Sequence, residues 1–490
     1  MTYVSKIIAD SGIQFGTSGA RGLVSDFTPE VCAAFTLAFL QSVSTRDGSA
    51  SSLAIAIDNR PSSPAMAAAC ASAAQALGIT VDYYGVIPTP ALAYQAMQDG
   101  VPAIMVTGSH IPFDRNGLKF YRPEGEITKQ DEQAIIASDA IFPSLTFNAL
   151  PEISCRAAKS YLARYLDIFP AACLTGLRIG LYEHSSTGRD LYSDLLSALG
   201  AEVISLERTD TFIPIDTEAV SQEDCEKARD WSESHQLDAI FSTDGDGDRP
   251  LIADEQGNWL RGDIVGLLCS QILGIEALAV PVSCNTAIEK SNVFAAVART
   301  KIGSPYVIAE FKNLSGAYAS VAGFEANGGF LLGADVQVAG QTLKALPTRD
   351  AVLPALVLLH ASASQKVGLS QLVDRLPQRY TASDRIKGIA TEQSRQLIAE
   401  YAVAPNTLLK QSGLDADGTV TVLGTNQTDG LRMTLSNSDI IHLRPSGNAP
   451  ELRCYAEADN QHKADRLVKQ CLQFVSTLGS PLISQDAPST

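Results

Sequence analysis

Three aspartates alternate with glycines in residues 242–249, which read STDGDGDR. An apolar stretch that we predict to be a strand precedes them, so Asp244, Asp246 and Asp248 lie on a loop loosened by glycine. Carboxylate oxygens are the ligands that a hard cation such as Mg²⁺ prefers, and three of them leave the ion open to another oxygen. Without a cation, carboxylates this close would repel one another. The loop therefore predicts a magnesium site.

The same spacing also fits a calcium loop of the EF-hand type. The three aspartates and Glu255 stand at its first, third, fifth and twelfth positions, but the sixth is Arg249 where the sharp turn needs glycine. An apolar segment, 251–253, follows at the place of the second EF-hand helix. An EF-hand and a solvated acidic turn remain the alternatives.

A serine follows another predicted strand, at 103–107, in residues 107–112, which read TGSHIP. This places Ser109 at the carboxyl end of a parallel strand, where α/β folds position reactive groups. His110 can donate to phosphate oxygens, and Lys119 adds a cation or proton acceptor, so the residues suit phosphoryl transfer. Acyl transfer fits poorly because no GxSxG motif is present. A serine with only a structural role in a turn is the alternative.

Two loops near opposite ends of the chain carry groups that bind anions. Residues 15–22, FGTSGARG, set Arg21 among three glycines and two hydroxyl residues, so that backbone N–H groups and the guanidinium could surround a phosphate. Residues 443–450, LRPSGNAP, form a second anion cup from Arg444, Ser446, Gly447 and Asn448. A flexible loop and a Pro-Gly turn are the respective alternatives.

A fifth loop, residues 323–330, reads GFEANGGF. We expect Glu325 and Asn327 to lie two apart in an extended stretch, so that both side chains point the same way. A carboxylate beside an amide suits adjacent sugar hydroxyls. A glycine-rich turn without ligand is the alternative.

Alternating helices and strands must position these loops. The helix at 29–43 is expected to begin with Thr28 as N-cap and Pro29 at its first position. We expect further helices at 63–77, 190–199 and 225–236, and strands at 53–57, 80–84, 103–107, 178–182, 201–205, 238–242, 280–283, 306–309 and 330–332. This alternation predicts parallel βαβ units. The last segment differs, because it reads as strands at 420–423, 430–435, 439–444 and 451–457 followed by a helix at 461–477.

The chain has 490 residues, which exceeds what one core can hold. Polar segments near 142–152 and 377–383 and a break at Gly262 suggest three boundaries. We therefore expect an α/β protein of three similar mixed α/β domains and a C-terminal α+β domain, at 1–150, 151–262, 263–376 and 377–490.

Composition excludes several classes of protein. The net charge of −17 argues against a nucleic-acid-binding surface, and the 45% hydrophobic content is ordinary for a soluble protein. No apolar run is long enough to span a membrane, and the N-terminus has no signal-peptide core, so we expect a cytoplasmic protein. The nine cysteines are scattered without CxxC spacing, which favours free thiols over zinc or disulfides.

In this order the five loops resemble those of the α-D-phosphohexomutase superfamily, the phosphoglucomutase and phosphomannomutase enzymes. The resemblance covers about residues 15–457 and includes segments 58–63, 212–218 and 306–307. It implies four domains around a central cleft, each contributing one loop. It also implies that Ser109 carries the transferable phosphate and completes the Mg²⁺ site of the three aspartates.

The resemblance assigns roles to the remaining loop residues. Arg21, His110 and Lys119 are expected to flank the phosphate in acid–base and charge-stabilising roles. The expected substrate-binding residues are Arg249 after the metal loop, Glu325 and Asn327 for sugar hydroxyls, and Arg444, Ser446, Gly447 and Asn448 for the non-reacting phosphate.

Several positions depart from the family pattern. Gly108 and Ile111 stand where alanine and asparagine are usual, and Asn448-Ala449 replaces Thr-Glu. The usual Gly-Glu-x-Ser-Gly-His of the sugar loop becomes FEANGG, which loses the serine and the histidine. Asn327 in this loop looks like the bacterial phosphomannomutases that serve surface-polysaccharide precursors.

The resemblance thus implies a phosphomannomutase that interconverts mannose 6-phosphate and mannose 1-phosphate through a phosphoserine and a hexose 1,6-bisphosphate, which also serves as activator. The route would feed nucleotide-sugar and surface polysaccharide synthesis. The alternatives are a phosphoglucomutase, a dual-specificity enzyme, a phosphoglucosamine mutase, a phosphatase and a non-catalytic phosphosugar-binding protein. The expected partner is a phosphohexose, with no nucleic acid and no membrane, and the expected state is a monomer or homodimer.

Overall fold

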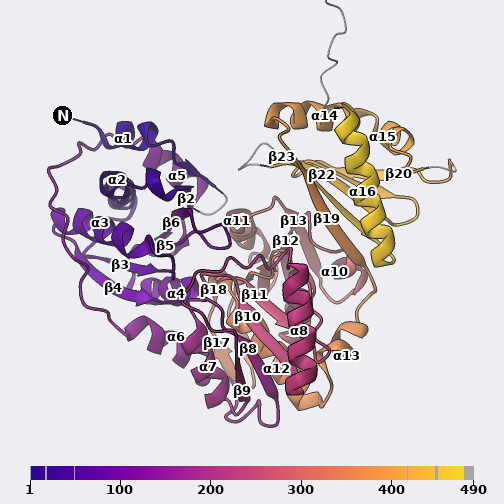
Figure 1. Ribbon diagram of the computed structural model, residues 1–490, viewed down its shortest axis with the longest axis horizontal. Helices are drawn as coiled ribbons and strands as arrows, with labels where there is room; N and C mark the ends of the chain where they lie inside the picture. Colours follow the sequence, from indigo (N-terminus) through magenta and orange to yellow (C-terminus); the bar gives the residue numbers. More distant parts are fainter. Residues whose placement is uncertain (1, 17–18, 49, 416–417, 447–450, 479–490) are drawn as a thin grey trace, which may run out of the picture. The chain divides into compact units, whose positions relative to one another are not determined.

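The computed structural model describes residues 2–16, 19–48, 50–415, 418–446 and 451–478 (Figure 1). The chain divides into two compact units. The larger comprises residues 1–281, 292–298 and 303–375, and the smaller comprises 282–291, 299–302 and 376–490. Among the described helices none has the length and apolar composition needed to cross a bilayer.

The N-terminal sheet has seven strands in the order β1-β2-β6-β5-β3-β4, with β7 paired to β6. Strands β3, β4 and β5 are parallel, whereas β6 runs antiparallel to β5 and β2, so the sheet is mixed. Its elements are α1 Val4–Asp10, β1 Gln14–Phe15, β2 Ala20–Leu23, a 3-10 helix Val24–Asp26, α2 Pro29–Asp47, β3 Ser52–Ile57, α3 Ser63–Ala76, β4 Thr80–Val86, α4 Thr89–Asp99, β5 Ala103–Val106, β6 Arg115–Arg122, β7 Gly125–Glu126 and α5 Lys129–Ile136.

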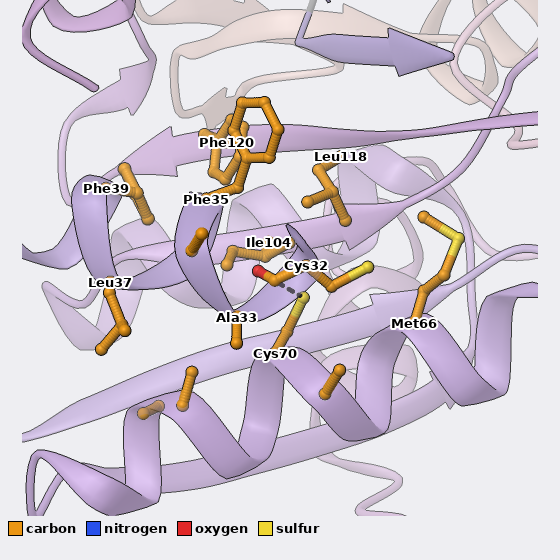
Figure 2. Packing of buried hydrophobic residues seen from close by; sticks show 14 of the residues in the cluster. Cys32, Ala33, Phe35, Leu37, Phe39, Met66, Cys70, Ile104, Leu118 and Phe120 are labelled. Atoms are coloured by element: carbon orange, nitrogen blue, oxygen red, sulfur yellow. Dashed lines mark hydrogen bonds between the residues drawn. The ribbon is translucent and has the colours of Figure 1, made fainter. Parts of the chain in front are cut away.

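Helix α2 is the centre of this domain's core. It starts as predicted, because the Thr28 hydroxyl accepts a hydrogen bond from the Val31 N–H at 3.3 Å. Figure 2 shows α2 packed against α3, with Phe35 and Phe39 facing Phe120 of β6. All nine cysteines of the chain are free, as expected, and six of them are buried.

A second sheet, ordered β11-β10-β8-β9, carries the metal loop directly after its central strand β10. Strands β8, β9 and β10 are parallel, and β11 runs antiparallel to β10, so the loop between β10 and β11 reverses the chain. The elements here are α6 Arg156–Leu166, β8 Arg178–Tyr182, α7 Arg189–Ala198, β9 Glu202–Leu206, α8 Gln222–His235, β10 Ala239–Thr243 and β11 Pro250–Ala253.

A third sheet, ordered β13-β12-β14-β15-β18, carries the sugar loop between the antiparallel strands β14 and β15. Its elements are α9 Gly262–Ile272, β12 Ala277–Pro281, α10 Ala287–Lys290, β13 Ala296–Thr300, α11 Ser304–Leu314, β14 Val321–Phe324, β15 Phe330–Leu332, the hairpin β16 Val336–Val338 and β17 Gln341–Leu343, β18 Leu346–Asp350, α12 Val352–Gln365 and α13 Leu369–Asp374.

The smaller unit contains a five-stranded antiparallel sheet in the order β19-β23-β22-β21-β20. Figure 1 shows α16 lying along this sheet, and its apolar face shares a core with the strands. The elements are β19 Tyr380–Lys387, α14 Thr391–Val403, α15 Pro405–Gln411, β20 Val422–Asn426, β21 Leu431–Leu435, β22 Ile440–Pro445, β23 Glu451–Ala458 and α16 Gln461–Leu478. The predicted combination of mixed α/β domains with a C-terminal α+β domain is thus confirmed.

Two local predictions were wrong. The strand expected at 306–309 lies inside helix α11, where Pro305 occupies the first turn and Val307 and Phe311, one helical turn apart, face the core. The strand expected at 280–283 begins earlier, at Ala277. Strand β19 begins at Tyr380, inside the polar segment 377–383 at which a domain boundary is predicted.

Candidate active site

Ser109 follows β5 in a backbone conformation that is rare for a residue with a side chain. Its φ is +54°, in the left-handed region, and the side chain is fully buried. The Ser109 N–H donates to the Thr107 hydroxyl at 2.8 Å, and the Ser109 hydroxyl donates to Asp244 Oδ2 at 2.6 Å. The turn therefore aims the hydroxyl at the carboxylates of the metal loop.

Two buried residues at the end of β3 hold this serine loop. Asp58 accepts from the Thr107 hydroxyl at 2.7 Å and from the Gly108 N–H at 3.3 Å. Arg60 donates to the carbonyl oxygens of Ser109, Ile111, Pro112 and Arg115 at 2.5–3.0 Å. A Cβ at position 108 would lie 2.6 Å from Arg60 Cζ, which accounts for glycine at that departure from the family pattern.

The three aspartates of the metal loop lie together as predicted. Asp244, Asp246 and Asp248 are buried, and one ligand oxygen of each lies within 4.8 Å of the others. Strand β11 follows the loop where an EF-hand needs a helix, which removes the calcium-loop alternative. Thr89, at the start of α4, donates its hydroxyl to Asp246 Oδ2 at 2.7 Å and thereby fixes that carboxylate.

Burial and charge give the three carboxyl groups different pKa values. Burial and the two neighbouring carboxylates raise the pKa of Asp244 well above its ordinary value. Burial acts in the same direction on Asp246, but the Lys119 ammonium outweighs it and lowers the pKa. Lys119 Nζ lies 2.5 Å from Asp246 Oδ2 and 2.6 Å from Asp248 Oδ2. The cluster thus presents both a cation and an excess of carboxylate oxygens.

The donor set fits a divalent cation. Buried Oδ1 atoms of Asp246 and Asp248 accept no hydrogen bond from any described residue, although Arg249 Nε lies 3.6 Å from Asp248 Oδ1. Unpaired carboxylate oxygens in a buried site are costly unless a cation neutralises them. Asp244, Asp246, Asp248 and the Ser109 oxygen would therefore hold the metal.

His110 pairs with Arg249, whose Nη1 lies 2.9 Å from His110 Nδ1. A guanidinium can only donate, so Nδ1 accepts and the hydrogen of the neutral ring is on Nε2. Burial and the nearby Arg249 charge lower the pKa of His110 well below its ordinary value. At neutral pH the ring is thus a neutral donor through Nε2.

Arg21 on β2 is a further cation of the larger unit's site. Burial, with the Arg249 charge as the next cause, lowers its pKa to about 10. Its Nε makes no hydrogen bond within the described residues. Positions 17–18 of this predicted phosphate loop lie outside the described residues.

The sugar loop has a different backbone from the predicted one. Glu325 and Asn327 lie in a tight turn and not in an extended stretch, because the Gly328 N–H donates to the Glu325 carbonyl at 2.9 Å. Gly328 has φ +90°, which the turn requires. The Asn327 Oδ1 accepts from the Gly329 N–H at 3.0 Å, so this amide also braces the turn.

The predicted anion cup lies in the smaller unit and is described only in part. Arg444 on β22 pairs with Asp429 at 3.0 Å. Ser446 is buried, and its N–H donates to the Glu451 carbonyl at 2.8 Å. Gly447 and Asn448 lie outside the described residues.

Sequence reasoning missed several residues that organise the site. Segment 58–63 resembles a family landmark, but the sequence assigns no role to Asp58 or Arg60 and marks neither Thr89 nor Arg349. Arg349 on β18 contacts both Asp248 and Glu325. No short motif surrounds Arg349, so only its spatial contacts identify it.

Four family models match this chain in order. They are described as phosphoglucomutase/phosphomannomutase alpha/beta/alpha domain I at residues 12–140, domain II at 159–257, domain III at 261–380 and the C-terminal domain at 390–473. Together these matches extend over most of the chain.

Full-length relatives and a solved structure agree with those matches. A phosphomannomutase of Salmonella muenchen is 59% identical, covering 96% of this chain and 97% of the relative. A phosphomannomutase of Sinorhizobium fredii is 41% identical, covering 95% and 99%. A phosphoglucomutase/phosphomannomutase family protein of Burkholderia thailandensis has the same fold, with a TM-score of 0.73 at 19% identity and coverage of 98% and 99%.

Proposed function

This chain belongs to the phosphoglucomutase/phosphomannomutase family, and we propose that it interconverts mannose 6-phosphate and mannose 1-phosphate. The carrying observation is the Ser109 hydroxyl, 2.6 Å from Asp244 within the buried aspartate cluster. The two phosphomannomutases that are 59% and 41% identical over nearly the full chain support the sugar assignment. The enzyme is thus an intramolecular phosphotransferase of carbohydrate metabolism.

In the proposed reaction, phosphorylated Ser109 transfers its phosphoryl group to the free hydroxyl of the sugar phosphate. The Oγ–P bond breaks as the sugar O–P bond forms, and the product is the hexose 1,6-bisphosphate. This intermediate turns over and returns its other phosphate to Ser109. Bound Mg²⁺ would neutralise charge on the serine phosphate.

Arg21, His110 and Lys119 are the other proposed catalytic residues. Arg21 stabilises charge on the transferring group, and His110 donates to a phosphate oxygen through Nε2. The sugar hydroxyl loses a proton in the transfer, and Lys119 would accept it after its ammonium has released a proton to solvent. As the ammonium paired with Asp246 and Asp248, Lys119 stabilises charge on the transferring group.

The other proposed components follow the family resemblance. Arg249, Glu325 and Asn327 would bind the sugar phosphate together with Arg444, Ser446, Gly447 and Asn448. The four domains would be 1–150, 151–262, 263–376 and 377–490. Hexose 1,6-bisphosphate would activate the enzyme, which would be a cytoplasmic monomer or homodimer feeding nucleotide-sugar and surface polysaccharide synthesis.

The test compares kcat/KM for the 1-phosphates of mannose, glucose and glucosamine. We expect mannose 1-phosphate to be preferred. A preference for glucosamine 1-phosphate would overturn the sugar assignment while leaving the mutase class intact. Free phosphate measured in the same reactions separates a mutase from a phosphatase, because a phosphatase releases one phosphate for each sugar consumed.

A further inference from the structure

Arg349 is a fully buried arginine that joins two loops of the site. It lies on β18, which pairs with β15 at the end of the sugar loop. Its Nε and Nη2 lie 3.1 and 3.0 Å from Asp248 Oδ2, and its Nη1 lies 3.2 Å from Glu325 Oε2. One rigid guanidinium therefore binds a carboxylate of each loop.

The contact with Asp248 leaves that carboxylate's other oxygen available. Lys119 and Arg349 both bind Oδ2, whereas Oδ1 accepts no hydrogen bond from a described residue. Two donors on one oxygen fix the rotation of the carboxylate. Arg349 thus orients Asp248 without occupying the oxygen that a metal would use.

Arg349 also binds one carboxylate oxygen of Glu325 and leaves the other oxygen available. Within the described residues, Arg349 is the one side chain that hydrogen-bonds this carboxylate, and it does so through Oε2. Without this contact the carboxylate could rotate within the turn. The arginine therefore fixes Glu325 through Oε2 and leaves Oε1 available to a sugar hydroxyl.

The sugar loop makes room for this arginine. A Cβ at Gly329 would lie 2.5 Å from Arg349 Cδ and 2.7 Å from its Cγ, so any side chain there would displace Arg349. Gly329 is also one of the positions at which the loop departs from the family pattern. The position of the Arg349 side chain consequently depends on the absence of a side chain at residue 329.

We propose that Arg349 is a positioning residue for sugar recognition: it fixes the Glu325 carboxylate against the metal loop in the orientation that accepts sugar hydroxyls. This rests on the proposed function for the nature of the ligand. A lysine at 349 keeps the charge but can bind only one of the two carboxylates at a time. Sugar binding should then weaken while the metal cluster keeps its charge balance.

The test measures binding of mannose 1-phosphate by calorimetry in a Ser109→Ala background, in which no turnover can occur. We expect Arg349→Lys to weaken binding by about tenfold. Mg²⁺ affinity should change less than about threefold, because Lys119 still binds Asp248 Oδ2 in this variant. In turnover by the Ser109 enzyme, KM should rise with a much smaller change in kcat, because the lost interaction is uniform binding. A dissociation constant within about twofold of the parent would overturn the proposal.

Two further variants separate positioning from general destabilisation. In a Glu325→Gln background, Arg349→Lys should have almost no additional effect on binding, whereas fully additive effects would contradict the proposal. Gly329→Ala should also weaken sugar binding, because its methyl group displaces the guanidinium. This variant tests the proposal if Arg349→Lys does not fold. Unchanged sugar binding by Gly329→Ala would contradict the proposal.

The matched control is Arg122→Lys, at another buried arginine, which pairs with Asp131 at 2.7 Å. It should leave sugar binding unchanged. Repeating the titrations with glucose 1-phosphate and glucosamine 1-phosphate keeps the two proposals distinct. If the sugar assignment is wrong, glucose 1-phosphate or glucosamine 1-phosphate should bind the parent more tightly than mannose 1-phosphate does. If the role given to Arg349 is wrong, Arg349→Lys should leave the affinity for all three ligands unchanged.

Discussion

The hydroxyl of Ser109 reaches the carboxylate cluster because its backbone adopts a positive φ, at +54°. A serine in an ordinary β conformation would direct its side chain to one face of the sheet and not beyond the strand end to Asp244. The strain of this conformation, on the order of 1 kcal/mol, is offset by the hydrogen bonds of Asp58 and Arg60 to the same loop. Strained conformations that the surrounding structure holds in place in this way cluster at active sites.

Replacing Ser109 with alanine should abolish turnover. The phosphoryl group would have no acceptor on the enzyme, so we expect kcat to fall by at least about 10³-fold, or roughly 4 kcal/mol of barrier. The matched control is Ser270→Ala, a buried serine of α9 whose hydroxyl donates to the Gly266 carbonyl. Mutase activity within about tenfold of the parent would remove Ser109 from the mechanism.

Short loops could be recognised from sequence because their chemistry is concentrated in a few neighbouring residues. The aspartates alternate along one segment, and the structure brings their oxygens within 4.8 Å. Arg349 could not be recognised in that way, since it lies 101 residues from Asp248 and meets it only in the fold. Contacts of that range have no local sequence signal.

At the scale of elements, β3 and β5 position the serine loop together. The two strands are parallel neighbours, so Asp58 and Arg60 at the end of β3 lie beside the loop that follows β5. Arg60 binds four carbonyl oxygens of this loop and stacks on the Phe212 ring at 4.0 Å. The Arg60 guanidinium thus supplies donors to carbonyl oxygens that would be paired with backbone N–H groups in a helix or sheet.

Arg60→Lys should therefore misplace Ser109 without removing any reacting group. Lysine cannot span four carbonyl oxygens, and a displacement of about 1 Å in the reacting group costs on the order of 100-fold in rate. We expect kcat to fall by about that factor, and the yield of phosphoserine after incubation with a hexose 1,6-bisphosphate to fall as well, measured by mass spectrometry.

The control for Arg60→Lys is Arg164→Lys. Arg164 is also buried and donates to a backbone carbonyl, that of Lys344, but it lies outside the proposed site. If both variants lose activity equally, the effect of Arg60→Lys reflects general destabilisation and the role given to Arg60 is wrong.

Local strand propensity led to the wrong prediction for residues 306–309. Residues 306–308 read Tyr-Val-Ile, which favours a strand, yet they lie in α11. Ser304 and Pro305 start the helix, and Val307 and Phe311 then pack into the third sheet's core. Tertiary packing of one helical face outweighed a propensity difference of less than about 1 kcal/mol per residue.

At the scale of the whole molecule, each compact unit contains, apart from His110 of the site, a fully buried histidine with a depressed pKa. His184 in the larger unit lies 2.9 Å from the Thr243 carbonyl, and His442 in the smaller unit hydrogen-bonds the Asp429 carbonyl at 2.5 Å. Burial lowers the pKa of each to about 4. Between pH 6.5 and pH 4 these two imidazole rings are therefore neutral in the folded protein, whereas they bind a proton in the unfolded chain.

This difference predicts a loss of stability in mild acid. Below the unfolded pKa of about 6.5 the unfolded chain binds a proton that the folded chain does not, so the free energy of unfolding falls as pH decreases. The loss should run from about pH 6.5 to about pH 4, the folded pKa, and then level off. For His442, a difference of roughly two to three pKa units corresponds to about 3 kcal/mol as an upper figure.

His442→Gln removes this titration, because glutamine can still donate to the Asp429 carbonyl and carries no charge. Compared with the parent, its free energy of unfolding should fall less steeply between pH 6.5 and pH 4, measured by urea denaturation followed by circular dichroism. His462→Gln, at an exposed histidine of α16, is the matched control and should keep the parent's slope. Equal slopes for the parent and His442→Gln would show that His442 does not couple folding of the smaller unit to pH.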